Sequence, residues 1–490
     1  MRASIQLTAA ATLLVLLLAG ALAVAATKGP QPQSPPKPEG SPGPAGSPAH
    51  ENPPRPESPP RGPFGFSRVT TPDGKPVAAD GFATSEDCSA CHSRQAAEFE
   101  GSFHSVSHHD PLYRAFAELA RKEAGEEVYA YCSGCHAPAS VVSGLVPGTP
   151  EAELPDNVKA GVQCDICHQT RALTGAEGPW GEPGNASIVL GPGAAKTSMR
   201  PEIKTNLAHT ASRAEFLESA EFCASCHTVI HPLNGLRIEH TYDEWRKSVY
   251  AEKGIQCQDC HMRSVEEAVR VAATLTPATV MGKTSELSGT EREIAPHWFV
   301  GGNVEAERLT GSAAHAEMAE ARLKSAAKLS IEEPTRSADG AELAFTVAVE
   351  NVGAGHALPT SLTELREMWL HVRVVDAANN VLFESGALDD HRELTPGTVR
   401  FGTTLLDAAG KPTFKPWEGA SFGYHRLIPP KEVERERFVA KLPAAAVGEL
   451  SIEARLHYRI AAPHVIQAVL GDKAFDPKVV EMASARASIP

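Results

Sequence analysis

The chain has 490 residues and a formal net charge of −14, from 46 Lys and Arg residues against 60 Asp and Glu residues. This length predicts two or three domains, and the acidic balance argues against nucleic acid or an anionic membrane surface as the main partner. Only 42% of the residues are hydrophobic, which indicates that groups other than apolar side chains help to fill the interior.

The first 65 residues combine an export signal with a linker. Residues 1–25 contain Arg2, a long apolar run and the small residues Ala23–Ala25, the pattern of a secretory signal peptide cleaved near Ala25. The run is long enough that an uncleaved membrane anchor is the alternative. Residues 26–65 are rich in Pro, Gly and Ser and predict an extended, disordered linker, either a tether or a leftover tail. We therefore expect an exported protein, periplasmic or on the cell surface.

Residues 66–312 contain all ten cysteines and leave about 50 residues for each cysteine pair, too few to build a separate apolar core. The region therefore predicts short helices joined by long loops. One helix is predicted from its N-cap Asp110, through Pro111 at the first helical position, to Gly125, which ends it. Another is predicted over 241–254.

Residues 313–490 have no cysteine and a different pattern. A connecting helix is predicted over 314–328. Five later runs alternate apolar and polar residues, and they cover 342–351, 368–377, 380–386, 434–442 and 450–460. Several short strands separated by turn signals predict a C-terminal β-sandwich. The expected fold class is multidomain α+β, with a region of short helices and loops before the sandwich.

Every cysteine belongs to a Cys-x-x-Cys-His motif. The cysteines are Cys88, Cys91, Cys132, Cys135, Cys164, Cys167, Cys223, Cys226, Cys257 and Cys260, and the histidines that follow each pair are His92, His136, His168, His227 and His261. A redox dithiol explains neither five copies nor a fixed histidine. Structural zinc needs four ligands, into which five pairs do not divide evenly. Disulfides are a further alternative for an exported chain.

Covalent attachment of haem c accounts for every feature of the motif. The two thiols bond to one porphyrin, and the histidine that follows binds its iron. The sequence therefore predicts five covalent haem c groups, with the five motif histidines as iron ligands. The region 66–312 is then a haem-packed domain, because the porphyrins supply much of its core.

Five irons need up to five further ligands. Histidine is the better candidate, because only three methionines lie within 66–312. An isolated histidine is more often a surface or hydrogen-bonded residue, but the density of histidines here favours ligation. The expected distal ligands are His104 (or His108), His209, His297 and His356, with His231 or His240 for the fifth iron. At position 356, a buried histidine that stabilises its loop is the alternative.

The five motifs resemble those of multihaem c-type cytochromes, including the cytochrome c-554 and hydroxylamine-oxidoreductase-like superfamily. Residues 241–262, 297–303 and 351–376 are similar to segments that recur in that group. The resemblance implies stacked haems, mostly with two histidine ligands, and electron transfer in respiratory metabolism. Pentahaem nitrite reductases also carry five haems, but they usually have lysine in place of one motif histidine and end in long helices. This chain has neither feature.

We expect a cytochrome that carries electrons between redox partners, such as quinol-linked or soluble cytochromes, in an exported respiratory pathway. The alternative is an oxidoreductase that acts on nitrite, hydroxylamine or a sulfur oxyanion at one open haem. Electron transfer is favoured because it requires no substrate pocket. A structural subunit of a surface cytochrome complex is a third class. No catalytic residue is assigned, and the sequence leaves enzymatic activity and oligomeric state open.

Overall fold

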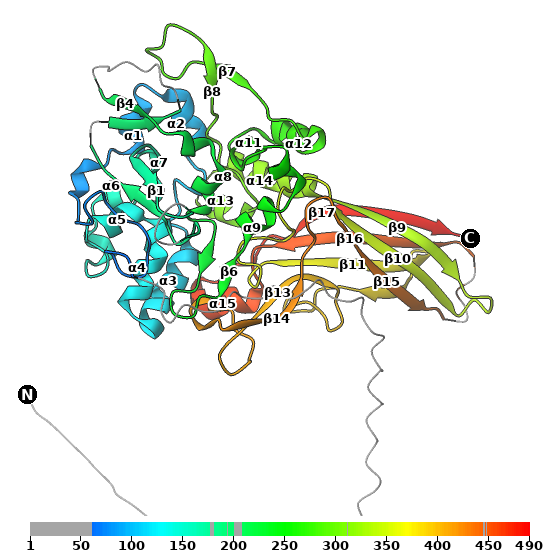
Figure 1. The fold of residues 1–490 in the computed structure, drawn as a ribbon. Coiled ribbons are helices and arrows are strands. Elements are labelled where there is room, and N and C mark those ends of the chain that lie inside the picture. The colour runs from blue at the N-terminus through cyan, green and yellow to red at the C-terminus, as the bar shows by residue number, and fades with distance from the viewer. Residues whose placement is uncertain are drawn as a thin grey trace, which may run out of the picture. The chain divides into compact units, whose positions relative to one another are not determined.

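Short helices and two-stranded ladders occupy the first part of the described chain, and long strands occupy its C-terminal part (Figure 1). The computed structural model describes residues 61–176, 181–193, 195–199, 208–310, 312–443, 446 and 448–490. The predicted signal peptide, 1–25, and residues 26–60 of the predicted linker lie outside the described residues. Within the described ranges, no helix is long and apolar enough to cross a membrane.

The helices before residue 327 are mostly one or two turns long. They are α1 (Ser85–Ser89), α2 (Ser93–Phe99), α3 (Pro111–Ala124), α4 (Glu126–His136), α5 (Pro138–Val142), α6 (Asp156–Lys159), α7 (Cys164–His168), α8 (Ala220–Ala224), α9 (Thr241–Arg246), α10 (Val249–Glu252), α11 (Gln258–His261), α12 (Val265–Thr274), α13 (Val304–Thr310) and α14 (Ala313–Ala326). This confirms the prediction of short helices joined by loops.

Four two-stranded ladders lie among these helices. They pair β1 (Thr170–Leu173) with β2 (Ile188–Leu190), β3 (Ala195–Ser198) with β4 (Thr210–Arg213), β5 (Val229–Ile230) with β6 (Arg237–Glu239), and β7 (Val280–Gly282) with β8 (Arg292–Ile294). Only β3 and β4 run parallel among these described ladders. Strands this short fix the loops that follow the motifs and build no extended sheet.

The two helices predicted in this region have different outcomes. The first is confirmed as α3, because the Asp110 carboxylate accepts a hydrogen bond from the Tyr113 N–H at 2.6 Å and Gly125 follows the helix with φ 95°. The prediction of one helix over 241–254 is wrong. The segment forms α9 and α10, because Ser248 between them caps α10 by accepting from the Tyr250 N–H at 3.2 Å.

Two antiparallel sheets make up most of the C-terminal part. One has the order β15–β10–β9 and the other β14–β13–β11–β16–β17, with β12 paired to β11. The strands are β9 (Ala327–Arg336), β10 (Glu342–Asn351), β11 (Glu367–Asp376), β12 (Val381–Ser385), β13 (Arg400–Leu406), β14 (Ser421–Arg426), β15 (Val433–Lys441), β16 (Leu450–Arg459) and β17 (Val480–Ile489), and helix α15 (Pro463–Leu470) lies between the last two strands.

Alternation along these strands builds one apolar core. Leu343, Phe345, Val347 and Val349 of β10 all lie on one buried face. They share a core cluster with residues of β11, β15, β16, β17 and α14. The five predicted runs are confirmed as β10, β11, β12, β15 and β16, and the connecting helix as α14, which ends two residues early because β9 begins at Ala327.

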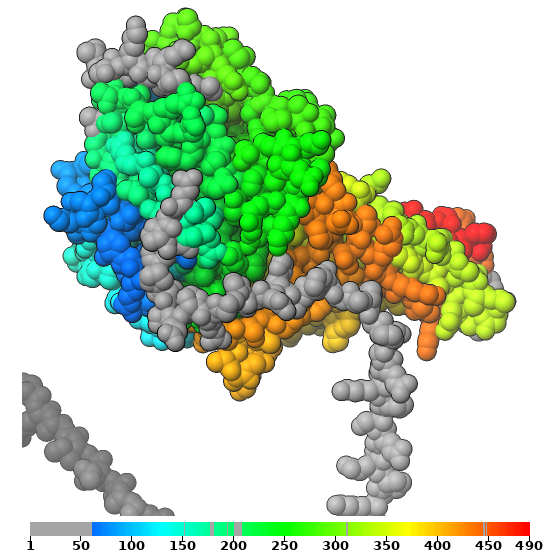
Figure 2. Space-filling model, in the orientation of Figure 1, coloured from blue at the N-terminus to red at the C-terminus, as the bar shows by residue number. Residues whose placement is uncertain are grey.

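The loop between β10 and β11 reaches from the sheets into the motif region. The Asn351 side chain holds the start of this loop, since it donates to the His356 carbonyl at 2.8 Å and accepts from the Ala354 N–H at 3.0 Å. Further along, Thr360 contacts Thr241 of α9 through their hydroxyls, 2.9 Å apart. Figure 2 shows green segments of the motif region directly against the orange C-terminal segments. The sheets therefore serve as a wall for the motif region.

Candidate haem-binding site

One large cavity runs through the region that holds the five motifs. Its volume is about 2520 Å³, whereas a pocket for one drug-sized ligand has about 300–1,000 Å³. All ten motif cysteines and all five motif histidines line it, as do His104, His209, His231, His297 and His356. The cavity therefore has room for several large groups, with covalent anchors for each along its wall.

Each motif contains a helical turn. The backbone N–H of His92, His227 and His261 donates to the carbonyl of the first cysteine of its own motif, at 3.0, 2.9 and 2.9 Å, and the other two motifs lie within α4 and α7. Residues three apart share a helix face, so the two sulfurs of a motif point the same way. All ten cysteines are free thiols. Among the described residues, no cluster of three or more His, Cys, Asp or Glu side chains could hold a metal ion directly.

Backbone carbonyls orient four of the motif histidines. The Nδ1–carbonyl pairs are His92 with Thr284 at 2.6 Å, His136 with Ser107 at 3.2 Å, His168 with Thr197 at 2.8 Å and His261 with Val300 at 2.8 Å. An imidazole that donates Nδ1–H to a carbonyl keeps its lone pair on Nε2, the usual state of a metal-bound histidine. These rings are thus held in the tautomer that an iron ligand requires.

His227 differs from the other motif histidines. Its Nδ1 lies 3.6 Å from Oε1 of Glu239, whose side chain is 7% exposed. Strand β6 brings Glu239 there, because it pairs with β5 directly after the motif and places Glu239 opposite Val229. Burial lowers the pKa of His227, but the Glu239 carboxylate more than offsets this effect and the pKa rises to about 9.

Four motif histidines each face a second imidazole. The ring centroids are 6.2 Å apart for His92 and His209, 6.0 Å for His227 and His104, 6.3 Å for His168 and His297, and 6.1 Å for His261 and His356. Two imidazoles on opposite sides of one metal have centroids about 6.2 Å apart, given a metal–nitrogen bond of about 2.0 Å and about 1.1 Å from nitrogen to ring centre. The residues present therefore fit an iron between the rings of each pair.

The four pairs differ in the angle between their rings. The planes are 26°, 20° and 18° apart in the pairs of His92, His168 and His261, but 71° apart for His104 and His227. In the three near-parallel pairs, the second histidine also has its Nδ1 on a backbone carbonyl. These carbonyls belong to Thr210, Ala295 and Ala357, at 3.1, 2.8 and 2.9 Å. In the pairs of His168 and His261, both rings therefore keep Nε2 for a metal.

Burial in the cavity wall keeps most of these histidines neutral. It lowers the pKa of His104 and His261 to about 3, and that of His136 and His297 to about 4. Only a neutral imidazole has the lone pair that binds a metal. The wall thus favours the ligating form of these side chains.

His136 stacks on a tyrosine. Its ring centroid is 3.8 Å from that of Tyr113, with planes 9° apart. In the ring contacts of the described residues, no second imidazole faces His136. His108 is buried beyond Tyr113, with ring centroids 6.0 Å apart, and neither of its ring nitrogens has a hydrogen-bond partner. The second motif is thus built differently from the other four.

The structure brings neither His231 nor His240 to a motif histidine in the described contacts. Nε2 of His231 donates to the Trp417 carbonyl at 3.0 Å, and its Nδ1 accepts from the N–H groups of Leu233 and Asn234 at 3.2 and 3.3 Å. His240 precedes α9, and its ring lies against that of Phe422, with centroids 6.1 Å apart. Backbone groups thus occupy both ring nitrogens of His231.

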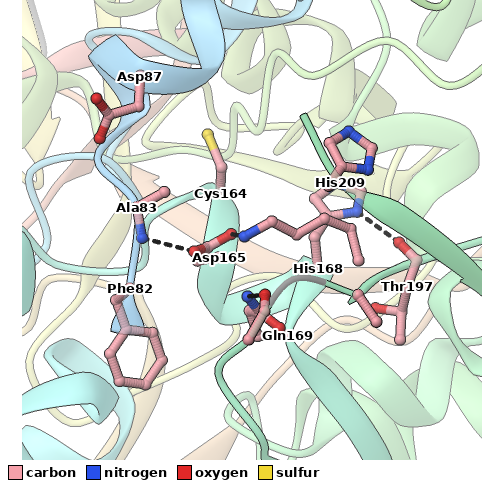
Figure 3. Close-up of polar contacts among 12 residues, drawn as sticks. Phe82, Ala83, Asp87, Cys164, Asp165, His168, Gln169, Thr197 and His209 are labelled. Atoms are coloured by element: carbon pink, nitrogen blue, oxygen red, sulfur yellow. Dashed lines mark hydrogen bonds and ion pairs between the residues drawn. The ribbon is translucent and has the colours of Figure 1, made fainter. Parts of the chain in front are cut away.

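Polar contacts tie the third motif to the segment that enters the first (Figure 3). Asp165, inside the motif, is buried and accepts hydrogen bonds from the Ala83 N–H at 2.6 Å and from Nζ of Lys196 at 2.7 Å. Ala83 lies just before α1, which carries the first motif. The adjacent Thr197 accepts from His168, so strand β3 positions both the carboxylate and the imidazole.

Cysteines of different motifs lie next to one another. The neighbouring thiol raises the pKa of one cysteine in each of the pairs Cys88–Cys164, Cys135–Cys226 and Cys223–Cys257, so the two thiols of each pair interact. Cys167 of the third motif also interacts electrostatically with Cys223 and Cys226. The fourth motif, 223–227, therefore neighbours the second, third and fifth, and we refer to it as the junction motif.

Two residues at the motif histidines were not assigned from the sequence as site residues. Glu239 reaches His227 through the β5–β6 ladder, and Tyr113 reaches His136 through the packing of α3 against α4. Neither contact has a fixed spacing along the chain. No sequence signal marks them, because the contacts arise only when the hairpin and the helix pair have formed.

Comparison with known proteins shows what the chain is similar to. The family model for cytochrome c554 and c-prime matches residues 87–169, which include the first three motifs. The fold is similar to that of a penta-haem cytochrome c552 from Thermochromatium tepidum, with a TM-score of 0.59 and 20% identity over 84% of this chain and 99% of that chain. A structural genomics target covers 34% of this chain and 90% of its own at 10% identity, with a TM-score of 0.16 that carries no argument. No curated protein matches the chain.

The motif turns, the free thiols and the facing histidines define a protein that binds haem covalently, as c-type cytochromes do. The family match agrees with that chemistry, and the fold likeness agrees with the architecture. Together these findings support a multihaem c-type cytochrome.

Proposed function

We propose that the chain carries electrons between redox partners through five covalent haem c groups, four of them held between two histidines. The observation that carries this proposal is the set of four facing imidazole pairs, each with one motif histidine and centroids 6.0–6.3 Å apart. When bound, haem c supplies a one-electron couple between Fe(III) and Fe(II). In chain order the proposed ligands are His92 with His209, His136, His168 with His297, His227 with His104, and His261 with His356.

The neighbouring cysteines support a route for the electrons. Interactions between thiols link the first motif to the third, and the junction motif to the second and the fifth. Ligation by two histidines favours a lower reduction potential than ligation by histidine and methionine. We propose a branched, low-potential path in which the junction motif connects the branches.

We also propose an exported location, in the periplasm or at the cell surface, with quinol-linked or soluble cytochromes as partners. The pattern of Arg2, an apolar run and Ala23–Ala25 supports export. The two C-terminal sheets share one core, which supports a β-sandwich whose β10–β11 loop supplies His356. N-terminal sequencing of protein purified from the exported fraction tests both signal cleavage and location.

A second candidate function rests on the second motif. His136 stacks on Tyr113 and faces no imidazole in the described ring contacts, so its iron would have one position free of histidine. Such an iron could bind nitrite, hydroxylamine or a sulfur oxyanion. We rank this activity second, because four of the five motif histidines face a second imidazole, which would leave their irons no open position.

Intact mass tests the primary proposal. Protein made with a working cytochrome maturation system should exceed its processed polypeptide by five haem masses. A mass with fewer haems, or a colourless preparation, would contradict the proposal. The matched control is the Cys257→Ser/Cys260→Ser variant, which should lose one haem mass and no more.

Ligand binding separates the two candidate functions. If the second iron takes a further ligand from the chain and all five haems only transfer electrons, the absorption spectrum should stay unchanged on addition of nitrite, cyanide or carbon monoxide. If one haem binds these ligands, the oxidoreductase candidate takes precedence. The variant Tyr113→Phe keeps the stack on His136 and removes the hydroxyl, so altered ligand affinity in this variant would assign the open site to the second motif.

A further inference from the structure

Glu239 places a buried negative charge beside one motif histidine. Among the ion pairs of the described residues, His227 is the one motif histidine that faces a carboxylate, with Nδ1 and Oε1 3.6 Å apart. The other four motif histidines face neutral backbone carbonyls through the same nitrogen. The junction motif therefore differs from the other motifs in the charge of the group that faces Nδ1 of its histidine.

The fold builds this contact. Glu239 ends β6, whose pairing with β5 fixes it opposite Val229, two residues after His227. The Thr241 hydroxyl donates to the same Oε1 of Glu239 at 3.3 Å and helps to hold the carboxylate in place. Arg237, on the same strand, pairs with Glu182 and Asp243 instead. The charge of Glu239 is thus directed at His227.

A carboxylate next to a ligating imidazole makes that ligand more basic. It draws the Nδ1 proton toward itself, and the electron-rich ring stabilises Fe(III) relative to Fe(II). A backbone carbonyl has the same effect only weakly, because it carries no net charge. At 3.6 Å the contact is longer than a hydrogen bond, but a buried charge at that distance favours Fe(III) through electrostatics as well.

We propose that Glu239 is a positioning and tuning residue that selectively lowers the reduction potential of the iron held by His227. The inference rests on the proposed function, since it requires haem c at Cys223 and Cys226. Its consequence lies in the topology. The junction motif neighbours the second, third and fifth motifs, so an electron that crosses between branches takes an uphill step there. Glu239 keeps the junction oxidised at rest and the electrons on the outer branches.

The test is a redox titration of the full five-haem protein, followed by EPR. Perpendicular imidazoles give a low-spin ferric signal of larger anisotropy than parallel ones, so the 71° pair of His104 and His227 has its own signature. In the wild-type protein, that signal should be the last of the four bis-histidine signals to disappear on reduction. In Glu239→Gln, it should disappear at a higher potential while the other three stay in place. Glu239→Asp should give an intermediate shift.

The control is Glu305→Gln, another buried carboxylate, which pairs with Arg308, accepts from the Lys478 N–H at 3.0 Å and does not face a motif histidine. It should leave the junction signal unchanged. Equal shifts of all components, no shift in Glu239→Gln, or a wild-type junction signal that disappears first would each overturn the proposal. The wild-type order tests it even if the variants fail to fold. Loss of the haem at this motif appears separately in the intact mass, and that result would count against the proposed function.

Discussion

The two parts of the molecule fill their interiors in different ways. The C-terminal sheets share a core of apolar side chains, including Phe345, Leu370 and Ile452. The motif region instead surrounds a cavity of about 2520 Å³ lined by cysteines and histidines. Close packing is what stabilises a folded domain, so a region built around such a space depends on a group that fills it. One polypeptide can thus combine a core of side chains with a core completed by its cofactor.

Removal of the covalent anchors should unfold one region and leave the other folded. Replacing all ten motif cysteines by serine removes the covalent anchors, and we expect the motif region to lose its fixed structure while the sheets keep theirs. Limited proteolysis with mass spectrometry should then yield a resistant fragment that begins between residues 313 and 327. The wild-type protein with five haems should resist over its whole described length. Equal resistance of both regions in the variant would show that side chains alone hold the motif region.

The converse change weakens only the sheets. Phe345 is 2% exposed in the C-terminal core, and Phe345→Ala should cost about 3–5 kcal/mol of unfolding free energy. We expect the midpoint of denaturation, followed by tryptophan fluorescence, to move to a lower denaturant concentration. The haem absorption of the first, third and fourth motifs should persist to the wild-type midpoint. Val439→Ala, at a residue 46% exposed on β15, is the control and should change stability by about 0.5 kcal/mol or less. Parallel loss of both signals would mean that the regions unfold as one unit.

The two regions meet at the β10–β11 loop, and His356 of this loop is the proposed iron ligand that the C-terminal region supplies. His356→Ala removes the imidazole that faces His261, so one haem of five should become high-spin and its potential should rise. His231→Ala is the matched control, because His231 also lines the cavity but backbone groups occupy both its nitrogens. It should leave the visible spectrum unchanged. An unchanged spectrum for His356→Ala would mean that this histidine only stabilises its loop.

The strands of the sheets are predictable from the sequence where apolar and polar residues alternate strongly. Strands such as β10, with large apolar residues at every second position, were predicted within a residue of their bounds. Strand β17 was missed, because its sequence VEMASARASI alternates mainly small residues that carry little hydrophobic signal. Strand β9 was missed because it follows α14 without a turn.

The site was less predictable than the motifs that anchor it. The anchors follow from local spacing, but the facing pairs join residues far apart in the chain, such as His104 and His227. Only the fold decides which histidine meets which. His231 opens the turn HPLNG, and the turn itself engages its ring. That turn signal was present in the sequence, and it argues for a capping role over ligation at this position.

At the same boundary, Glu244 should make the stability of the protein depend on pH. Burial raises the pKa of Glu244 from 4.5 to about 7, and its carboxyl accepts hydrogen bonds from the Thr360 hydroxyl at 2.6 Å and the Ala357 N–H at 3.1 Å. Between pH 4.5 and 7 the unfolded chain releases a proton that the folded protein keeps, so stability falls as the pH rises. Glu244→Gln keeps the accepting oxygen and cannot ionise.

Urea denaturation of the five-haem protein should therefore show a stability difference, variant minus wild type, that is near zero at pH 4.5. It should grow to about 3 kcal/mol by pH 7.5 and then level off. Glu332→Gln is the control, because Glu332 pairs with Arg435 at the surface of the sheets, and its difference should stay within about 0.5 kcal/mol at every pH. A constant difference for Glu244→Gln would exclude ionisation as its cause. A difference that grows with pH would show that the Glu244 side chain, which joins the two regions, is uncharged where the protein is most stable. Burial between two cores requires this uncharged form.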